Sequence, residues 1–142
     1  RRHYQKAVEL YQEALKLIDE HSPHYLATLD RYIFSCHAGN LLAKESLLEL
    51  AQKGLALANA ANSNDWINFQ LHLYLLNDEM ENYYQCVETI ALPYFKKMGY
   101  RILIDYFEKK LFQYLYENGE VERALVLASS LIQGRPNIYE NK

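Results

Sequence analysis

The side chains best suited to metal or redox chemistry in this sequence are five histidines and two cysteines. His21 and His24 lie on either side of Ser22-Pro23, and Cys36 is followed directly by His37. In a helix, two neighbouring side chains point about 100° apart, so Cys36 and His37 could not face one ion together. Neither spacing is the regular ligand spacing of a zinc site. The sequence therefore predicts no metal and no other cofactor.

Motifs for covalent or phosphoryl chemistry are also missing. There is no glycine-rich phosphate loop, no G-x-S-x-G elbow and no cysteine-histidine pair in a distinctive context. Acidic pairs such as Asp78/Glu79 and Glu120/Glu122 lie where helices are expected to begin, and there they favour the helix dipole. We predict that the chain is not an enzyme.

Amino-acid composition narrows the possible classes of function. The 142 residues are 50% hydrophobic and carry a net charge of -3, so one domain is expected, without the basic surplus needed for direct nucleic-acid contact. No apolar run approaches the length of a membrane span, and we expect no membrane partner. Cys36 and Cys86 are too far apart for a secreted disulfide scaffold. A reduced, cytoplasmic setting is predicted.

Apolar residues recur at helical spacing almost throughout, and Gly, Pro, Asn and Ser clusters divide the pattern into segments. No stretch shows the alternation of apolar and polar residues that is typical of a β-strand. The sequence predicts an all-α fold of about seven helices, at residues 3–20, 23–38, 42–60, 64–77, 82–98, 100–117 and 120–133.

The second half combines many aromatic residues with a proline inside a predicted helix. Pro93 cannot donate the bond to the carbonyl four residues back, so it either kinks the helix near Ala91-Leu92 or opens a separate short helix. Tyr106, Phe107 and Phe112 are predicted to be core, since aromatic rings bury the largest apolar area.

A small-large-small pattern recurs along the helices. Ala7, Tyr11 and Ala14 resemble the second helix of a tetratricopeptide repeat, in which small residues let two helices approach closely. Weaker copies are Ser46/Leu50/Gly54, Val87/Ala91/Tyr94 and Ala124/Ala128/Leu131. Their first positions are 39, 41 and 37 residues apart. The resemblance implies antiparallel helix pairs in a single domain over residues 1–142. The chain starts on a second helix and without Met, so we expect a C-terminal fragment of a longer protein.

A narrower resemblance covers residues 90–125, IALPYFKKMGYRILIDYFEKKLFQYLYENGEVERAL. Its Pro93-Tyr94-Phe95-Lys96-Lys97 run, its regularly spaced aromatic residues and its Glu117-Asn118-Gly119-Glu120 turn are similar to the C-terminal repeats of Gram-positive peptide-sensing regulators. That group includes the Rap-type phosphatases, the NprR- and PlcR-type transcription factors and the arbitrium receptors. The resemblance implies a tetratricopeptide-like right-handed superhelix whose concave face holds a short signalling peptide, and an effector domain upstream.

Candidate peptide-binding residues follow from the repeat register. Twelve residues before each small position lies the groove face of a first helix, which gives the candidates Arg31, Ser35, Asn68, His72, Lys109 and Gln113. Members of each pair are four residues apart and share a helix face. For Arg31, Lys109 and Gln113 a solvated outer face is an equal alternative. His72 is alternatively a buried histidine that donates to a backbone carbonyl.

Two functions are consistent with these features. The first is a peptide-binding sensor domain of a quorum-sensing-type regulator, which changes superhelical pitch or repeat-mediated dimerisation when its peptide binds. The second is a constitutive adaptor that docks a partner protein, or forms a homodimer, without a small ligand. Binding of short peptides separates the two.

Overall fold

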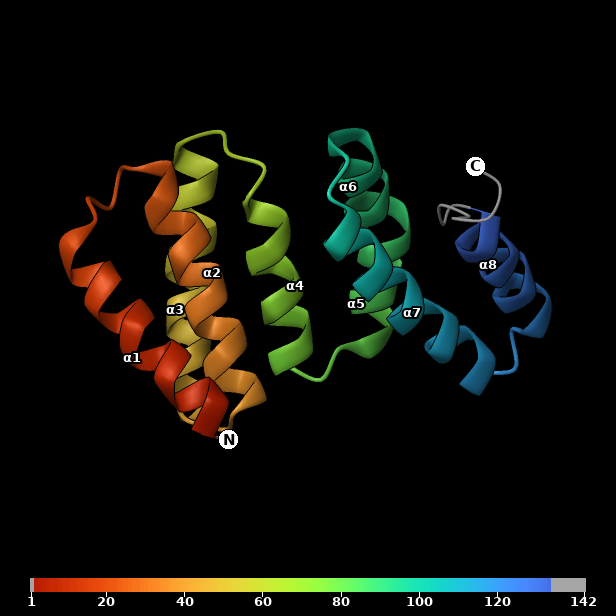
Figure 1. Ribbon diagram of the computed structural model, residues 1–142, viewed down its shortest axis with the longest axis horizontal. Helices are drawn as coiled ribbons and strands as arrows, with labels where there is room; N and C mark the ends of the chain where they lie inside the picture. The colour runs from red at the N-terminus through yellow and green to blue at the C-terminus, as the bar shows by residue number, and fades with distance from the viewer. Residues whose placement is uncertain (1, 134–142) are drawn as a thin grey trace, which may run out of the picture. The chain divides into compact units, whose positions relative to one another are not determined.

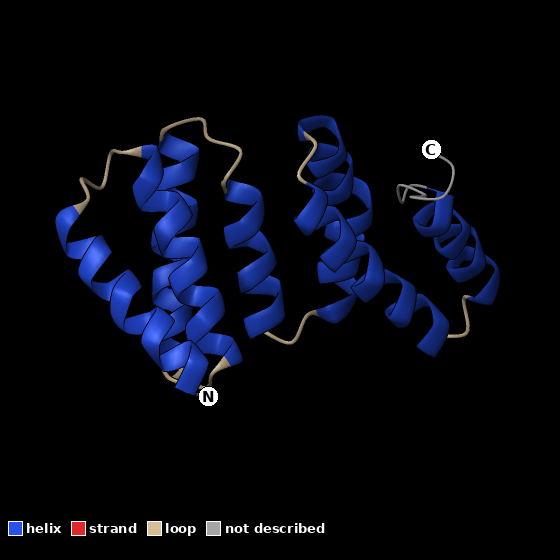
Figure 2. Cartoon of the chain, viewed as in Figure 1, coloured by secondary structure: helices blue, strands red, loops and turns tan. Residues whose placement is uncertain are grey.

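The computed structural model describes residues 2–133, and all regular structure in that range is helical (Figure 2). The helices are α1 (Arg2–Leu17), α2 (Pro23–Ala38), α3 (Lys44–Ala60), α4 (Trp66–Leu76), α5 (Met80–Cys86), a π-helical segment η1 (Val87–Ala91), α6 (Leu92–Met98), α7 (Arg101–Glu117) and α8 (Val121–Gln133). Because α5, η1 and α6 are continuous, residues 2–133 form seven rods (Figure 1). The predicted all-α class is confirmed. None of the helices described is both long and apolar enough to cross a bilayer.

Contacts divide the chain into two compact units, of which the first ends at Tyr83 and the second begins at Tyr84. In the first unit, α1 packs on α2, α2 on α3 and α3 on α4, and α2 also contacts α4. In the second unit, η1 and α6 pack on α7, and α7 packs on α8. Within each unit, consecutive rods run antiparallel (Figure 1). The chain thus consists of helical hairpins, and the superhelix and the single domain stay predictions.

Five of the described helices end with the same C-terminal capping motif. One or two residues after each end, the chain adopts a left-handed conformation with φ between 51° and 78°, at Asn40, Asn62, Asp78, Gly99 and Gly119. In each case the next N–H donates to a carbonyl five residues back, as from Leu41 to Cys36 at 2.9 Å. This bond satisfies a carbonyl that the helix leaves unpaired. The turns predicted around Asn40 and Asn62 are confirmed by this geometry.

Close approach of α3 and α4 depends on Gly54. A Cβ placed on Gly54 would lie 2.3 Å from Cε1 of Phe69, whose side chain is fully buried. Ala51 and Ala58 lie on the same face of α3 and are also fully buried. The small residues of α3 therefore form the surface on which the Phe69 ring packs.

The predicted repeat register is wrong in α3. Ser46, expected to be the small residue at a helix contact, is exposed. The small-large-small spacing that does face the core is Ala51, Leu55 and Ala58. The period near 40 residues consequently does not hold at this helix. In α1, Leu10 lies at helical spacing from Ala7 and Ala14 but is 71% exposed.

Pro93 neither starts a separate helix nor interrupts the rod. The turn before it is π-helical, and the Leu92 N–H donates to the Val87 carbonyl five residues back. A π turn is one residue wider than an α turn, so it accommodates a proline that lacks a donor. The outcome lies between the two predicted alternatives.

Aromatic packing forms the core of the second unit. Phe95 and Phe107 stack with ring centroids 5.6 Å apart, and Tyr84 stacks on Tyr114 at 4.0 Å. Phe107 is buried as predicted, and Phe112 is partly buried. Tyr106 was predicted to be core but is 39% exposed. Its ring meets Phe107 edge to face from the solvent side.

Candidate functional site

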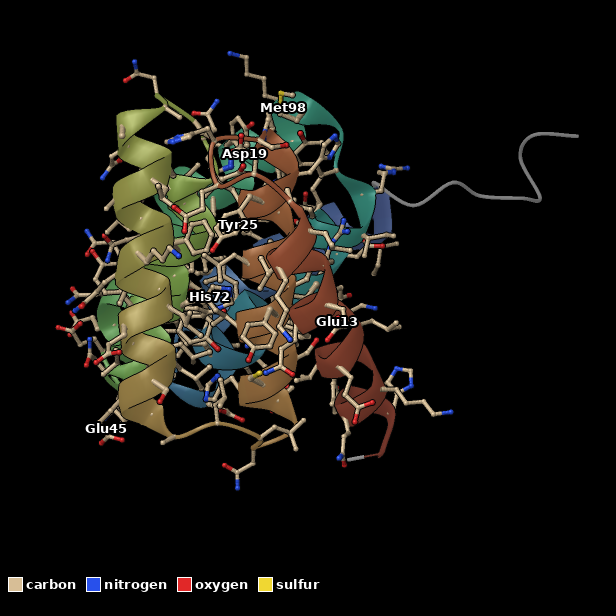
Figure 3. All side chains as sticks on the ribbon, turned by 90° about the vertical axis from the view of Figure 1, so that its left-hand side faces the viewer. Glu13, Asp19, Tyr25, Glu45, His72 and Met98 are labelled. Atoms are coloured by element: carbon tan, nitrogen blue, oxygen red, sulfur yellow. The ribbon has the colours of Figure 1, made fainter. Side chains whose placement is uncertain are left out.

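A polar pair joins α2 and α4 in the first unit. His72 Nε2 lies 2.6 Å from Asp30 Oδ1, and the side chains are 12% and 28% exposed. Figure 3 shows His72 among the side chains inside the helix stack. The Phe69 ring borders the imidazole, with centroids 6.5 Å apart. This hydrogen bond favours the orientation of α4 in which the face with His72 turns toward α2.

A second carboxylate, Asp65, lies close enough to Asp30 to interact with it electrostatically. Burial raises the pKa of Asp65, the hydrogen bond that Ser63 Oγ donates to it at 3.1 Å opposes this, and repulsion from Asp30 adds to the rise. Asp65 lies three residues before Asn68 and seven before His72, so the three share one face of α4. The α2–α4 contact therefore carries two carboxylates, an amide and an imidazole.

Asp65→Asn is expected to stabilise the protein modestly at pH 7. A raised pKa in the folded state means that ionised Asp65 opposes folding, and that the opposition disappears as pH falls below its unfolded pKa. Urea unfolding at neutral and acid pH measures this: the gain should vanish near pH 3.

The control is Asp105→Asn, since Asp105 is an exposed carboxylate. It should change stability by less than about 0.5 kcal/mol. A loss of stability in Asp65→Asn at pH 7 would mean that the hydrogen bond from Ser63 outweighs the burial of the charge.

Four of the six predicted site residues belong to α2 and α4. Arg31 is exposed on α2, and Asn68 is partly buried on α4. Ser35 is 6% exposed and lies in the interior, so a ligand has little access to it. His72 is partly buried, with 12% of its side chain exposed, and its partner is a carboxylate rather than the backbone carbonyl of the buried alternative.

The other two predicted residues, Lys109 and Gln113, lie on α7 in the second unit. Both are exposed, and Gln113 Nε2 donates to Glu117 Oε1 at 3.0 Å. Lys109 and Gln113 are one helical turn apart and share a face, as predicted. They form a polar surface within their own unit.

Sequence reasoning missed Asp30 and Phe34. Asp30 is the partner of His72, and Phe34 lies one turn later on the same face of α2 with 43% of its surface exposed. The only sequence signal for Asp30 was indirect. A histidine among the apolar residues of α4 needs a polar partner when it is buried, but the sequence does not show which residue that partner is. Exposure of a Phe on a contact face has no sequence signal.

One hollow of the first unit lies away from this contact. A surface pocket of about 350 Å³ is lined mainly by the α1–α2 loop and the end of α3, including Pro23, Leu26 and Leu57. None of the six predicted residues lines it. It is mainly apolar, and its polar lining residues are Glu20, His21, Ser22 and Ser63.

Possible metal ligands are dispersed in the part of the chain that the structure describes. No three His, Cys, Asp or Glu side chains come together there as metal ligands could. Burial raises the pKa values of both Cys36 and Cys86, which keeps the thiols protonated and unreactive at neutral pH. The groups at the α2–α4 contact are suited to recognition by hydrogen bonds.

Comparison with known proteins adds no relative. No family model, no curated protein and no solved structure matches this chain. The resemblance to tetratricopeptide repeats and to peptide-sensing regulators stays a prediction from the residues that carry it.

Proposed function

We propose that this chain is the peptide-binding sensor domain of a cytoplasmic, quorum-sensing-type regulator, in which the peptide controls a separate effector domain. The observation that carries the proposal is the α2–α4 contact with its Asp30–His72 hydrogen bond. In the repeat arrangement, α2 and α4 are the first helices of successive hairpins, the helices that line the groove. The two cysteines, both free and buried, are consistent with a reducing compartment.

The chemistry of this face suits an extended peptide. A peptide backbone presents alternating donors and acceptors, and the Asn68 amide offers both. On α2, Arg31 adds a charged hydrogen-bond donor and Phe34 adds an exposed aromatic ring. A ligand bridging α2 and α4 would bias the angle between neighbouring hairpins, and small rotations add up along a repeat protein.

Titration calorimetry against a library of peptides of about seven residues tests the proposal. A subset should bind, and Asn68→Ala should weaken that binding about fivefold, because a typical hydrogen bond contributes about 1 kcal/mol. The matched control is Asn59→Ala, since Asn59 is exposed on α3 and outside the proposed groove. Absence of binding by every peptide, or equal weakening by both variants, would contradict the proposal.

The adaptor alternative is favoured by one observation on α8. Leu125, Val126 and Ile132 are between 60% and 74% exposed, and Val121 is 46% exposed. Exposed apolar surface of this kind is typical of association sites. Light scattering that finds a stable dimer, together with no peptide binding, would favour a constitutive dimerisation or docking domain.

A further inference from the structure

The turn between α6 and α7 exposes large apolar side chains. We refer to residues 96–102 as the α6–α7 tip. Met98 is 47% exposed, Tyr100 42% and Ile102 86%. Figure 3 shows Met98 at the end of α6, pointing away from the ribbon. Gly99, with φ 73°, reverses the chain there. The tip therefore presents a convex apolar surface.

Positive charge surrounds these apolar groups. Lys96, Lys97 and Arg101 lie in the tip, and no carboxylate occurs from residue 89 to residue 104, in a chain whose net charge is -3. Lys96 Nζ lies 3.7 Å from Glu108 Oε2, so this one cation is partly neutralised. Lys97 and Arg101 are exposed. The tip is thus a local exception to the acidic character of the chain.

The start of α7 adds a third feature. Its N-cap, Tyr100, makes no side-chain hydrogen bond to the first turn. The N–H groups of Ile102 and Leu103 at an uncapped helix start point outward and favour anionic oxygens. Cations, helix N–H groups and apolar side chains thus converge on one short turn.

We propose that the α6–α7 tip docks on the surface of a bilayer containing anionic phospholipids. Met98 and Ile102 would enter the interface, and Lys97 and Arg101 would contact phosphate groups. Single-stranded nucleic acid fits less well, because its bases stack on aromatic rings and leave two aliphatic side chains without a partner. Contact with a membrane surface needs no helix that crosses it.

This proposal is an alternative to the expectation that the chain has no membrane partner. It does not depend on the proposed peptide-binding function, because the tip lies outside the α2–α4 contact. Loss of one function would leave the other testable.

Flotation of the whole chain with vesicles tests the proposal. The protein should float with vesicles of phosphatidylcholine mixed with phosphatidylserine, and much less with phosphatidylcholine alone or at raised salt. Ile102→Ser should weaken binding about tenfold, and neutralising Lys97 or Arg101 to Gln about fivefold each. Ile102→Trp should bind at least as well as the parent, with blue-shifted emission, which shows that the site tolerates substitution.

The matched controls are Leu17→Ser and Lys44→Gln. Leu17 is 86% exposed, as Ile102 is, but lies at the end of α1, and Lys44 is an exposed cation of α3. Neither should change vesicle binding. The proposal is overturned if the chain does not bind vesicles, or if the tip variants and the control variants weaken vesicle binding equally. It is also overturned if the chain binds a single-stranded oligonucleotide or an acidic peptide more tightly than it binds vesicles, and if the tip variants abolish that binding.

Discussion

Gly54→Ala is expected to lower the free energy of unfolding, because overpacking a core usually costs about 1–3 kcal/mol. The added methyl group would lie 2.3 Å from a ring carbon of Phe69, which has no solvent-exposed surface into which it could move. This cost opposes, and should exceed, the gain of about 1 kcal/mol that Ala brings to a helix. Urea unfolding followed by the fluorescence of Trp66, at the start of α4, measures the change.

Two comparisons make this result specific. Ser46→Ala places the same residue at an exposed position of α3, where the change should stay within about 0.5 kcal/mol. In a Phe69→Leu background, Gly54→Ala should cost less, because the ring that causes the overlap is gone. A neutral Gly54→Ala variant would show that α3 and α4 can separate without loss.

Phe95→Ala is expected to cost about 3–5 kcal/mol, the range for deleting a buried aromatic ring. Phe95 is 1% exposed, and its ring packs against Phe107, Tyr94 and Tyr100. Removal leaves a cavity between α6 and α7 that these rings cannot fill without losing their own contacts. Urea unfolding followed by circular dichroism measures the loss in the second unit.

The size-matched control is Tyr116→Ala, which removes a ring that is 62% exposed on α7. Its cost should stay within about 1 kcal/mol. Equal losses in the two variants would mean that Phe95 is not the centre of this core, and that packing is shared evenly around α7.

Helix number and helix ends could be predicted from the sequence because their signals are local. Asn40, Asn62 and Gly119 each adopt the left-handed conformation that these residue types tolerate. Ser22 likewise caps α2, accepting from the His24 N–H at 3.2 Å, with Pro23 directly after it. Each such signal is complete within a few residues.

The repeat register of α3 could not be predicted in the same way. Small residues occupy more than one face of this helix, at Ser46 and at Ala51, Gly54 and Ala58. Periodicity identifies each set equally well, and Gly54 fits both. Only the position of the Phe69 ring, which depends on the packing of α4, selects the buried set.

The Asp30–His72 pair illustrates the same limit at the candidate site. Its members are 42 residues apart, so no local spacing connects them. The sequence identified His72 and Asn68 as polar residues of α4, but the partner on α2 is set by the contact between hairpins. Tyr106 was misplaced for a related reason, because its helix has apolar side chains on more than one face.

The pairing of helices that are neighbours in sequence has a kinetic consequence. Most contacts join a helix to the next one, or to the next but one, along the chain. Folding therefore closes only short loops, and the entropic cost of closing them is small. Chains dominated by such local contacts reach the native state in microseconds to milliseconds. Assembly can therefore begin at whichever hairpin forms first.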